Sequence, residues 1–314
     1  MTQSSEKSAF AGERIAKVLA RAGVCSRRDA EKMIADGRIA VDGRRLDTAA
    51  VHVTPQHKVA VDGKPLGDPD PPRLWRYHKA AGLVTTTRDP EGRPTVFQKL
   101  PPNLPRLNTI GRLDINTEGL LLMTNDGELK RFLELPSTGW LRRYRVRAFG
   151  SADAGRLESL KNGIEIDGVR YRSIEVDLER KQGGNVWMTV ALREGKNREI
   201  KRVLEHLDMK VNRLIRLSFG PFQLGNLEAG EVEEVPRRVL RQQLGREWHK
   251  LVGDEGAGAS ANPTDPHASA STGVSEKAGK PQRRNAHNRG VQNHGTERRE
   301  TQNRGGQNHG TERR

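Results

Sequence analysis

The sequence predicts an α+β protein in which a small α/β domain precedes a larger domain, a mixed, largely antiparallel β-sheet flanked by helices. Three observations lead to this prediction. Two amphipathic helical segments followed by two Asp-Gly turns occupy the first 66 residues. Short strand-like and helix-like segments then alternate as far as about residue 235. Several neighbouring strand-like segments are joined by turns too short for a parallel crossover, which favours antiparallel pairing.

Length and composition limit the possible functions. The 314 residues suggest two folded units, and the net charge of +15 attracts phosphate polyanions. No run approaches the roughly 18 apolar residues of a membrane-spanning helix, and the first residues contain no apolar signal core. The single cysteine, Cys25, excludes an internal disulfide and a multi-cysteine zinc site. We therefore expect a cytoplasmic protein without membrane contact.

Local patterns predict the elements of the first unit. Apolar residues at helical spacing predict a helix over residues 13–22, and Ser26 followed by Asp29 is a start signal for a second helix. The segments 39–44 and 59–64 each place Asp-Gly between strand-like residues, which is typical of tight hairpins. Two helices and a small sheet are the expected result.

Two basic residues occupy the start of the second helix. Arg27 and Arg28 lie in its first turn, where the helix dipole disfavours a cation unless an anion such as phosphate approaches. An ordinary solvated basic face is the alternative interpretation.

The second unit is predicted to alternate strands and helices. Eight strands are expected, at 74–78, 83–87, 109–113, 119–124, 141–149, 169–178, 186–193 and 211–219. Helices are expected near Val96, Glu128, Ala152 and Asn197, with a terminal helix beyond residue 235.

Changes in composition predict the domain boundaries. Prolines between residues 67 and 73 favour an extended linker. From Gly253 to Arg314 the only apolar side chains are alanines and two valines, too few to fold a core. The predicted parts are a flexible arm (1–12), a small domain (13–66), the linker (67–73), a larger domain with a terminal helix (74–252) and a disordered low-complexity tail (253–314).

One motif of the larger unit carries residues suited to chemistry. It reads Gly111-Arg-Leu-Asp-Ile-Asn-Thr-Glu-Gly-Leu120, with Asp114 at a predicted strand end and Arg112 on the same strand face. The sequence has no dinucleotide-binding glycine motif, no P-loop, no HExxH and no Cys/His cluster. Taken alone, Asp114 fits a turn or cap residue better than a catalytic one.

Several motifs resemble known families. Residues 13–66 contain Arg-Ile-x-Lys-Val-Leu-Ala-x-Ala-Gly-Val-x-Ser-Arg-Arg, and they resemble the S4 RNA-binding domain. The motif Gly-Arg-Leu-Asp-x-x-Thr-x-Gly-Leu resembles the signature of the RsuA/RluB group of pseudouridine synthases, which couple an S4-like domain to a catalytic domain. Segments 78–82, 142–146 and 194–202 match that group in the expected order. Two further segments are closest to its RluB branch, which acts on large-subunit (23S) ribosomal RNA.

The resemblance implies three catalytic residues. Asp114 matches the catalytic aspartate, and Lys201 occupies the position of the cation that orients it, where the family often has arginine. Tyr144 would pack on the flipped uracil, and its alternation with arginines places it on the apolar face of its strand. The alternatives are a solvated helix charge for Lys201 and a core tyrosine for Tyr144.

The resemblance also implies RNA contacts. Arg112 would fill the gap left in the RNA by an extruded uridine. Arg27 and Arg28 would touch the RNA backbone, which positions the protein without reading sequence. Ile200, on the core stripe of the predicted helix after Asn197, completes the expected substrate contacts.

The implied reaction is the conversion of uridine to pseudouridine. It breaks the glycosidic bond at nitrogen 1 and rejoins the base through carbon 5 without net redox change, so we expect neither a cofactor nor a metal. The sequence thus predicts a monomeric ribosomal RNA pseudouridine synthase that modifies a specific uridine, in 23S RNA or a large-subunit precursor. The alternative is a non-catalytic RNA-binding or ribosome-assembly protein.

Overall fold

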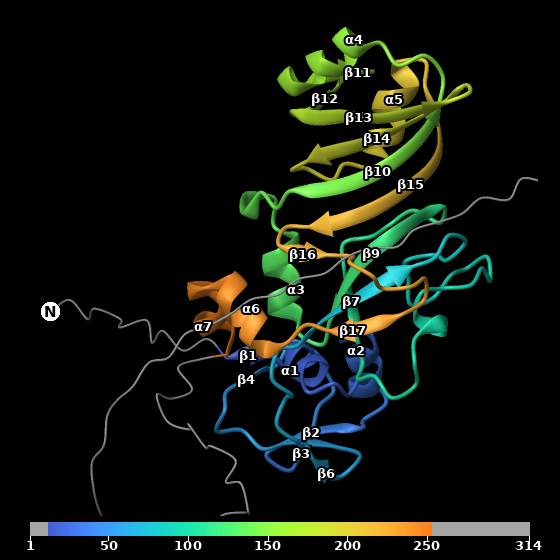
Figure 1. The fold of residues 1–314 in the computed structure, drawn as a ribbon. Coiled ribbons are helices and arrows are strands. Elements are labelled where there is room, and N and C mark those ends of the chain that lie inside the picture. Colours follow the sequence, from blue (N-terminus) through green and yellow to red (C-terminus); the bar gives the residue numbers. More distant parts are fainter. Residues whose placement is uncertain (1–11, 253–314) are drawn as a thin grey trace, which may run out of the picture. The chain divides into compact units, whose positions relative to one another are not determined.

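The computed structural model describes residues 12–252 (Figure 1). The predicted tail, and all but the last residue of the predicted arm, lie outside the described residues. Within the described part, every helix is too short or too polar to cross a bilayer.

The two predicted N-terminal helices are present. They are α1 (Ile15–Arg21) and α2 (Arg27–Ala35). The Ser26 hydroxyl accepts a hydrogen bond from the Asp29 amide at 3.0 Å, so the predicted start signal is a helix cap. The apolar faces of both helices enter one core, which contains the fully buried Ile15, Leu19 and Ala30.

A four-stranded sheet completes this core. Its strands are β2 (Ile39–Val41), β3 (Arg44–Arg45), β5 (Val59–Val61) and β6 (Lys64–Pro65), in the order β3-β2-β5-β6. Asp42 and Gly43 have φ of 48° and 78°, and Asp62 and Gly63 have φ of 50° and 78°. These left-handed pairs are the geometry that Asp-Gly favours in two-residue hairpins, so both hairpins are confirmed. A separate pair joins β1 (Glu13–Arg14) to β4 (His52–Val53).

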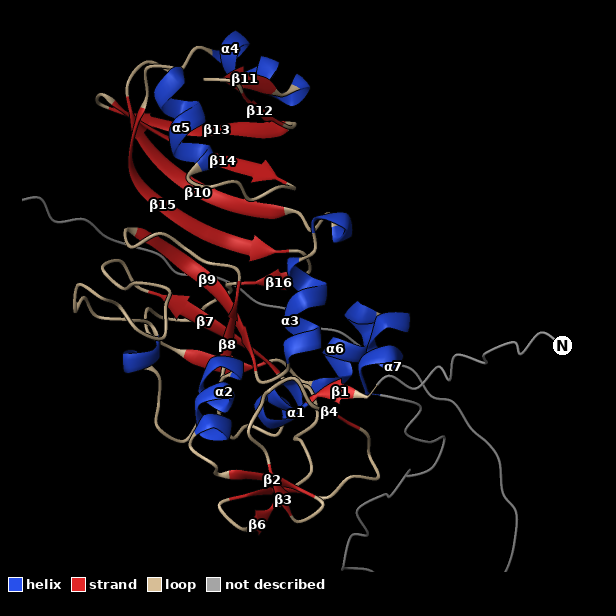
Figure 2. Ribbon diagram, turned by 180° about the vertical axis from the view of Figure 1, so that it is seen from behind, coloured by secondary structure: helices blue, strands red, loops and turns tan. Residues whose placement is uncertain are grey.

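A nine-stranded sheet organises the larger part (Figures 1 and 2). The order is β13-β14-β10-β15-β9-β7-β17, with β16 beside β15 and β8 beside β9. Every pairing is antiparallel except that of β9 with β15, which confirms the predicted mixed, largely antiparallel sheet. The strands are β7 (Leu74–Lys79), β8 (Asn108–Ile110), β9 (Thr117–Thr124), β10 (Arg142–Phe149), β13 (Ile174–Gln182), β14 (Asn185–Leu192), β15 (Lys210–Phe219), β16 (Phe222–Gln223) and β17 (Val232–Glu234).

Two cores pack against this sheet. The first core lies between the strands β10, β14 and β15 and the helix α5 (Glu199–His206), which covers one face of these strands (Figure 2). This core extends to α4 (Ala154–Ser159). The other contains α3 (Gly127–Glu134), α6 (Arg237–Leu244) and α7 (Arg246–Val252). Strand β9 is buried on both faces, with Leu121 in the first core and Leu120 in the second.

Two expectations for this sheet were wrong, and the expected terminal helix is divided. The segment 83–87 is not a strand, because the Thr85 hydroxyl bonds the Leu113 carbonyl and only Val84 forms an isolated bridge, to Thr95. The expected strand 169–178 is divided into β12 (Val169–Tyr171), which pairs with β11 (Ile164–Ile166), and β13. The terminal helix is two helices, α6 and α7, separated at Gly245, whose φ is 52°.

The predicted helices were found at three of four places. Those near Glu128, Ala152 and Asn197 correspond to α3, α4 and α5. The helix expected near Val96 is a single 3-10 turn, Phe97–Lys99.

Candidate active site

The site lies where the two halves of the sheet join, at the parallel pair of β9 and β15. Gly119 has a φ of 100°, and a Cβ there would lie 2.4 Å from the Arg216 carbonyl oxygen. Only glycine therefore allows the two strands to approach at this point. The close approach fixes the loop before β9, residues 111–116, beside β15 and α5.

Asp114 lies in this loop and faces α5. Lys201 lies in the first turn of α5. Its ammonium lies 3.2 Å from Asp114 Oδ2. Side-chain exposure is 34% for Asp114 and 19% for Lys201, so substrate can reach the carboxylate while the ion pair is partly shielded from water. The predicted pairing of these two residues is therefore present in the structure.

A buried lysine supports the same loop from the β7 side. Lys79 is fully buried, and its ammonium donates to the carbonyls of Ala80, Ile115 and Thr117 at 3.0, 3.1 and 2.8 Å. Burial lowers the pKa of Lys79 to about 8, and the Asp114 carboxylate opposes that lowering. The cation thus holds the backbone on both sides of Asn116. Lys79 stands in the matching segment 78–82, but no role was predicted for it.

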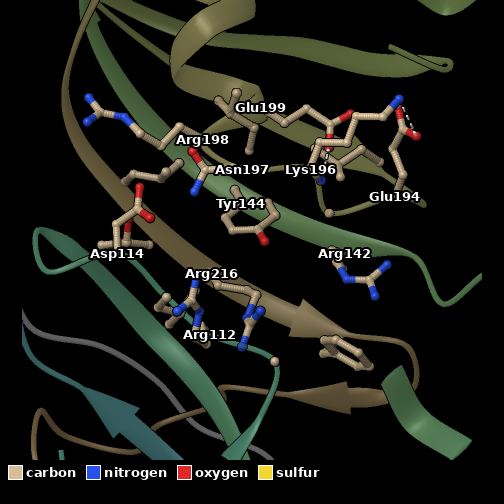
Figure 3. Close-up of a pocket in the computed structure, with 18 of the residues that line it drawn as sticks. Arg112, Asp114, Arg142, Tyr144, Glu194, Lys196, Asn197, Arg198, Glu199 and Arg216 are labelled. Atoms are coloured by element: carbon tan, nitrogen blue, oxygen red, sulfur yellow. Dashed lines mark hydrogen bonds and ion pairs between the residues drawn. The ribbon is translucent and has the colours of Figure 1, made fainter. Parts of the chain in front are cut away.

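Tyr144 lies on β10 in the middle of the pocket. It is 9% exposed, on the apolar strand face as predicted, and pairs with Arg216 of β15 across the ladder. It lines a cavity of about 840 Å³ together with Arg112, Asp114, Ile200 and Lys201. Figure 3 shows the Tyr144 ring between the loop before α5 and the arginines Arg112 and Arg216.

The loop before α5 and the first residue of this helix form another wall of the cavity, and each contributes one acid, Glu194 and Glu199. Glu199 is 3% exposed, and its Oε2 accepts the Lys196 amide at 3.0 Å. Burial, and next the neighbouring Glu194 carboxylate, raise the pKa of Glu199 to about 7. Glu194 itself accepts the Arg172 amide at 2.6 Å and the Lys196 ammonium at 3.0 Å. The pair therefore holds one proton below about pH 7.

The structure brings most predicted site residues together. Asp114, Tyr144, Lys201, Arg112 and Ile200 all line the same cavity. Ile200 is also 5% exposed and part of the core, so both of its expected roles are compatible.

The remaining predicted contacts lie elsewhere. Arg27 and Arg28 are the first residues of α2 and do not line this cavity. Residues 12–252 contain no group of three His, Cys, Asp or Glu side chains placed to hold a metal.

Three polar residues near the site escaped sequence analysis. Lys79, Glu199 and Arg216 are buried charges whose surroundings are set by strands distant in sequence. Lys79 and Glu199 stand in the segments 78–82 and 194–202 that matched a family pattern, and that was the only signal available for them.

Comparisons with known proteins agree with this geometry. Residues 73–206 match the RNA pseudouridylate synthase family, and residues 13–59 match the S4 domain. An uncharacterized RNA pseudouridine synthase of Rickettsia felis is 45% identical over 230 residues, 73% of this chain and 100% of that protein.

Two relatives that are named for a target, and one protein of known structure, are also similar to this chain. The ribosomal large subunit pseudouridine synthase B of Yersinia pestis is 40% identical, over 68% of this chain and 69% of that protein. Its Salmonella typhi counterpart is 41% identical over 68% and 75%. A crystal structure of a pseudouridylate synthase superposes with a TM-score of 0.52 at 23% identity, covering 74% of this chain and all of that one, which shows the shared fold.

Proposed function

Because the chain belongs to the RNA pseudouridine synthase family, we propose that it isomerises a specific uridine of large-subunit (23S) ribosomal RNA, with Asp114 as the catalytic residue. The observation that carries this proposal is the ion pair of Asp114 with Lys201, at 3.2 Å, in a cavity that Tyr144 also lines. The large-subunit target is supported by relatives at 40% and 41% identity that are named for it.

The reaction requires a carboxylate beside the target nucleotide. The bond between nitrogen 1 and the sugar breaks, a bond between carbon 5 and the sugar forms, the proton on carbon 5 leaves, and nitrogen 1 takes up a proton. An ionised Asp114 can act as nucleophile or as base, and the ion pair with the Lys201 ammonium fixes its direction. No atom is supplied from outside the nucleotide except protons exchanged with water.

The other lining residues suit a base that has left the RNA helix. A stacked uridine cannot reach a carboxylate inside a cavity, so the nucleotide must be extruded at a cost of a few kcal/mol. The Tyr144 ring offers an apolar surface for the uracil, Ile200 borders the same space, and Arg112, on the exposed loop, is placed to enter the vacated stack. Arg27 and Arg28 would bind backbone phosphates through the S4 domain.

A direct test is tritium release from 23S ribosomal RNA labelled at carbon 5 of uracil. Release by the intact protein and none by Asp114→Asn, with both proteins folded by circular dichroism, is the expected result. Equal release by both proteins would exclude Asp114 as the catalytic group. No release from 23S RNA or its assembly intermediates, with undiminished RNA binding, would favour the ribosome-assembly role instead.

A further inference from the structure

Two arginines in the cavity wall share one aromatic ring. The guanidinium carbon of Arg142 lies 4.5 Å from the centroid of the Phe219 ring, and that of Arg216 lies 5.4 Å from it. Both arginines and Phe219 line the cavity that contains Asp114. Two like charges are therefore held close together at one place in the pocket.

The hydrogen bonds of these arginines leave donors unused. Arg216 is 3% exposed, its Nε donates to the Leu120 carbonyl at 2.7 Å, and its buried Nη2 has no partner. Arg142 Nη1 donates to the carbonyls of Trp140 and Arg193 at 2.9 and 2.7 Å. The partners are all neutral carbonyls, so they satisfy hydrogen bonds but do not balance charge.

The charge of this pair is not balanced by a direct ion pair. Among residues 12–252, no carboxylate forms an ion pair within 4.0 Å of Arg142 or Arg216. Burial lowers the pKa of Arg142 from its usual value, and the charge of Arg216 adds to that lowering. A buried charge without a counter-ion is costly, and a second one beside it increases the cost. Such an arrangement is stabilised when an anion enters.

We propose that Arg142 and Arg216 form a subsite for one backbone phosphate of the substrate RNA, next to the nucleotide that is isomerised. This inference rests on the proposed function, because it takes the cavity to be the RNA site. Guanidinium groups match phosphate in shape and charge, and RNA supplies one such anion at every nucleotide. The uracil itself is neutral and cannot balance two cations.

The strand register places the subsite beside Tyr144. Arg216 is the ladder partner of Tyr144, so the two side chains leave the sheet from adjacent positions. Tyr144 is the surface on which we place the uracil. A phosphate at Arg216 therefore belongs to the target nucleotide or to its immediate neighbour, and it would hold the extruded nucleotide against the ring.

Phosphate ethylation interference tests this assignment along the whole transcript, whichever uridine is the target. Randomly ethylated 23S ribosomal RNA transcripts are bound to the full-length Asp114→Asn protein, and ethylated phosphates that weaken binding are mapped. We expect interference at a phosphate adjacent to the modified uridine, and its loss when Arg216→Gln is added. Arg142→Gln should remove the same signal, while Arg216→Lys should weaken it.

Arg143→Gln is the matched control. Arg143 is the neighbour of Arg142 on β10, is exposed, and does not line the cavity, so its replacement should leave the pattern near the uridine unchanged. The salt dependence gives a second reading. The slope of log K against log salt should fall by about one for Arg216→Gln and stay unchanged for Arg216→Lys.

Thermal melting separates a phosphate ligand from a structural arginine. Arg216→Gln removes an unbalanced buried charge, so its Tm without RNA should equal or exceed that of the parent protein. A lower Tm of Arg216→Gln with an unchanged interference pattern would overturn the proposal. An unchanged interference pattern with reduced turnover would also overturn it, and it would assign Arg216 to the uracil. The Asp114→Asn protein could show an interference signal that is lost with Arg216→Gln, while the protein with Asp114 restored forms no pseudouridine. In that case the proposed function fails and the phosphate subsite stands.

Discussion

Replacing Glu199 by glutamine should stabilise the protein at alkaline pH and have little effect in acid. Glu199 begins α5, is 3% exposed, and has one buried oxygen, Oε1, without a partner. Its neighbours are Glu194, which raises its pKa, and Lys196, whose charge opposes that rise. Arg142 of β10 is the further charged group that interacts with it. Burial, the largest cause, and Glu194 together raise the pKa of Glu199 to about 7 from its ordinary 4.5.

The sign of the effect follows from proton binding. Below pH 4.5 both the folded and the unfolded protein hold the proton on Glu199, and above about 7 both have lost it. Between these values the folded state binds the proton more tightly, so this group's contribution to stability falls as pH rises. At about 1.4 kcal/mol per pKa unit, Glu199 costs about 3 kcal/mol at pH 8 and below about 1 kcal/mol at pH 5.

Glutamine reproduces the protonated acid at every pH. Its carbonyl can accept the Lys196 amide, which lies 3.0 Å from Glu199 Oε2, and its amide can donate to Glu194. The free energy of unfolding of Glu199→Gln should therefore exceed that of the parent protein by about 2 to 3 kcal/mol at pH 8, and the two should nearly agree at pH 5. The full effect requires that the glutamine carbonyl and the glutamine NH2 group both find these hydrogen-bond partners.

Urea unfolding followed by circular dichroism between pH 5 and 8 measures this difference. Glu205→Gln, an exposed residue of the same helix, is the control and should show no pH-dependent difference from the parent protein. If Glu199→Gln also tracks the parent protein across this range, Glu199 is ionised throughout and its proton is not retained in the folded state. A lower stability at pH 8 would show that the charged form is favoured.

Three further substitutions test the support of Asp114. Lys201→Met should reduce kcat/KM about 100-fold in tritium release, whereas Lys201→Arg retains most activity; a solvated lysine would give wild-type rates for both. Lys79→Met should lower the free energy of unfolding by roughly 1 to 3 kcal/mol in urea titrations and reduce kcat more than it raises KM, because the loop loses the donor to the Ile115 and Thr117 carbonyls. Gly119→Ala should cost more than about 2 kcal/mol in the same titrations, and unchanged stability would contradict the close approach of β9 to β15.

Local signals in the sequence predicted what is decided locally. The Asp-Gly turns at residues 42 and 62 have the expected left-handed geometry, and Ser26 caps α2. The alternation around Tyr144 placed it on the correct strand face. In each case the residues that determine the conformation lie within a few positions of one another, so a short window contains the necessary information.

Long-range partners decided what the sequence could not show. The segment 83–87 was predicted to be a strand, but the Thr85 hydroxyl bonds the Leu113 carbonyl, 28 residues away, in place of a ladder. The Arg216 guanidinium bonds the Leu120 carbonyl, 96 residues away. For Lys201, helical spacing left a solvated charge as the alternative, and only the tertiary distance to Asp114 places it in an ion pair. A charged residue is ordinary on a surface and exceptional in a core, and its sequence neighbours do not distinguish the two.

The buried charges of the pocket share a physical logic. Lys79 is costly to bury and Arg216 lacks a counter-ion, yet both lie within the framework that holds Asp114 and Tyr144. A hydrophobic residue in place of Arg216 would make the free protein more stable, whereas Lys79 also holds the loop carbonyls of Ile115 and Thr117. Replacing Arg216 would also remove a positive charge that attracts a polyanion into the cavity. The free energy lost in the free protein is regained when a phosphate enters, so the charge of Arg216 favours RNA over neutral ligands. Removing Arg216 should therefore separate the two properties, raising stability while weakening RNA binding.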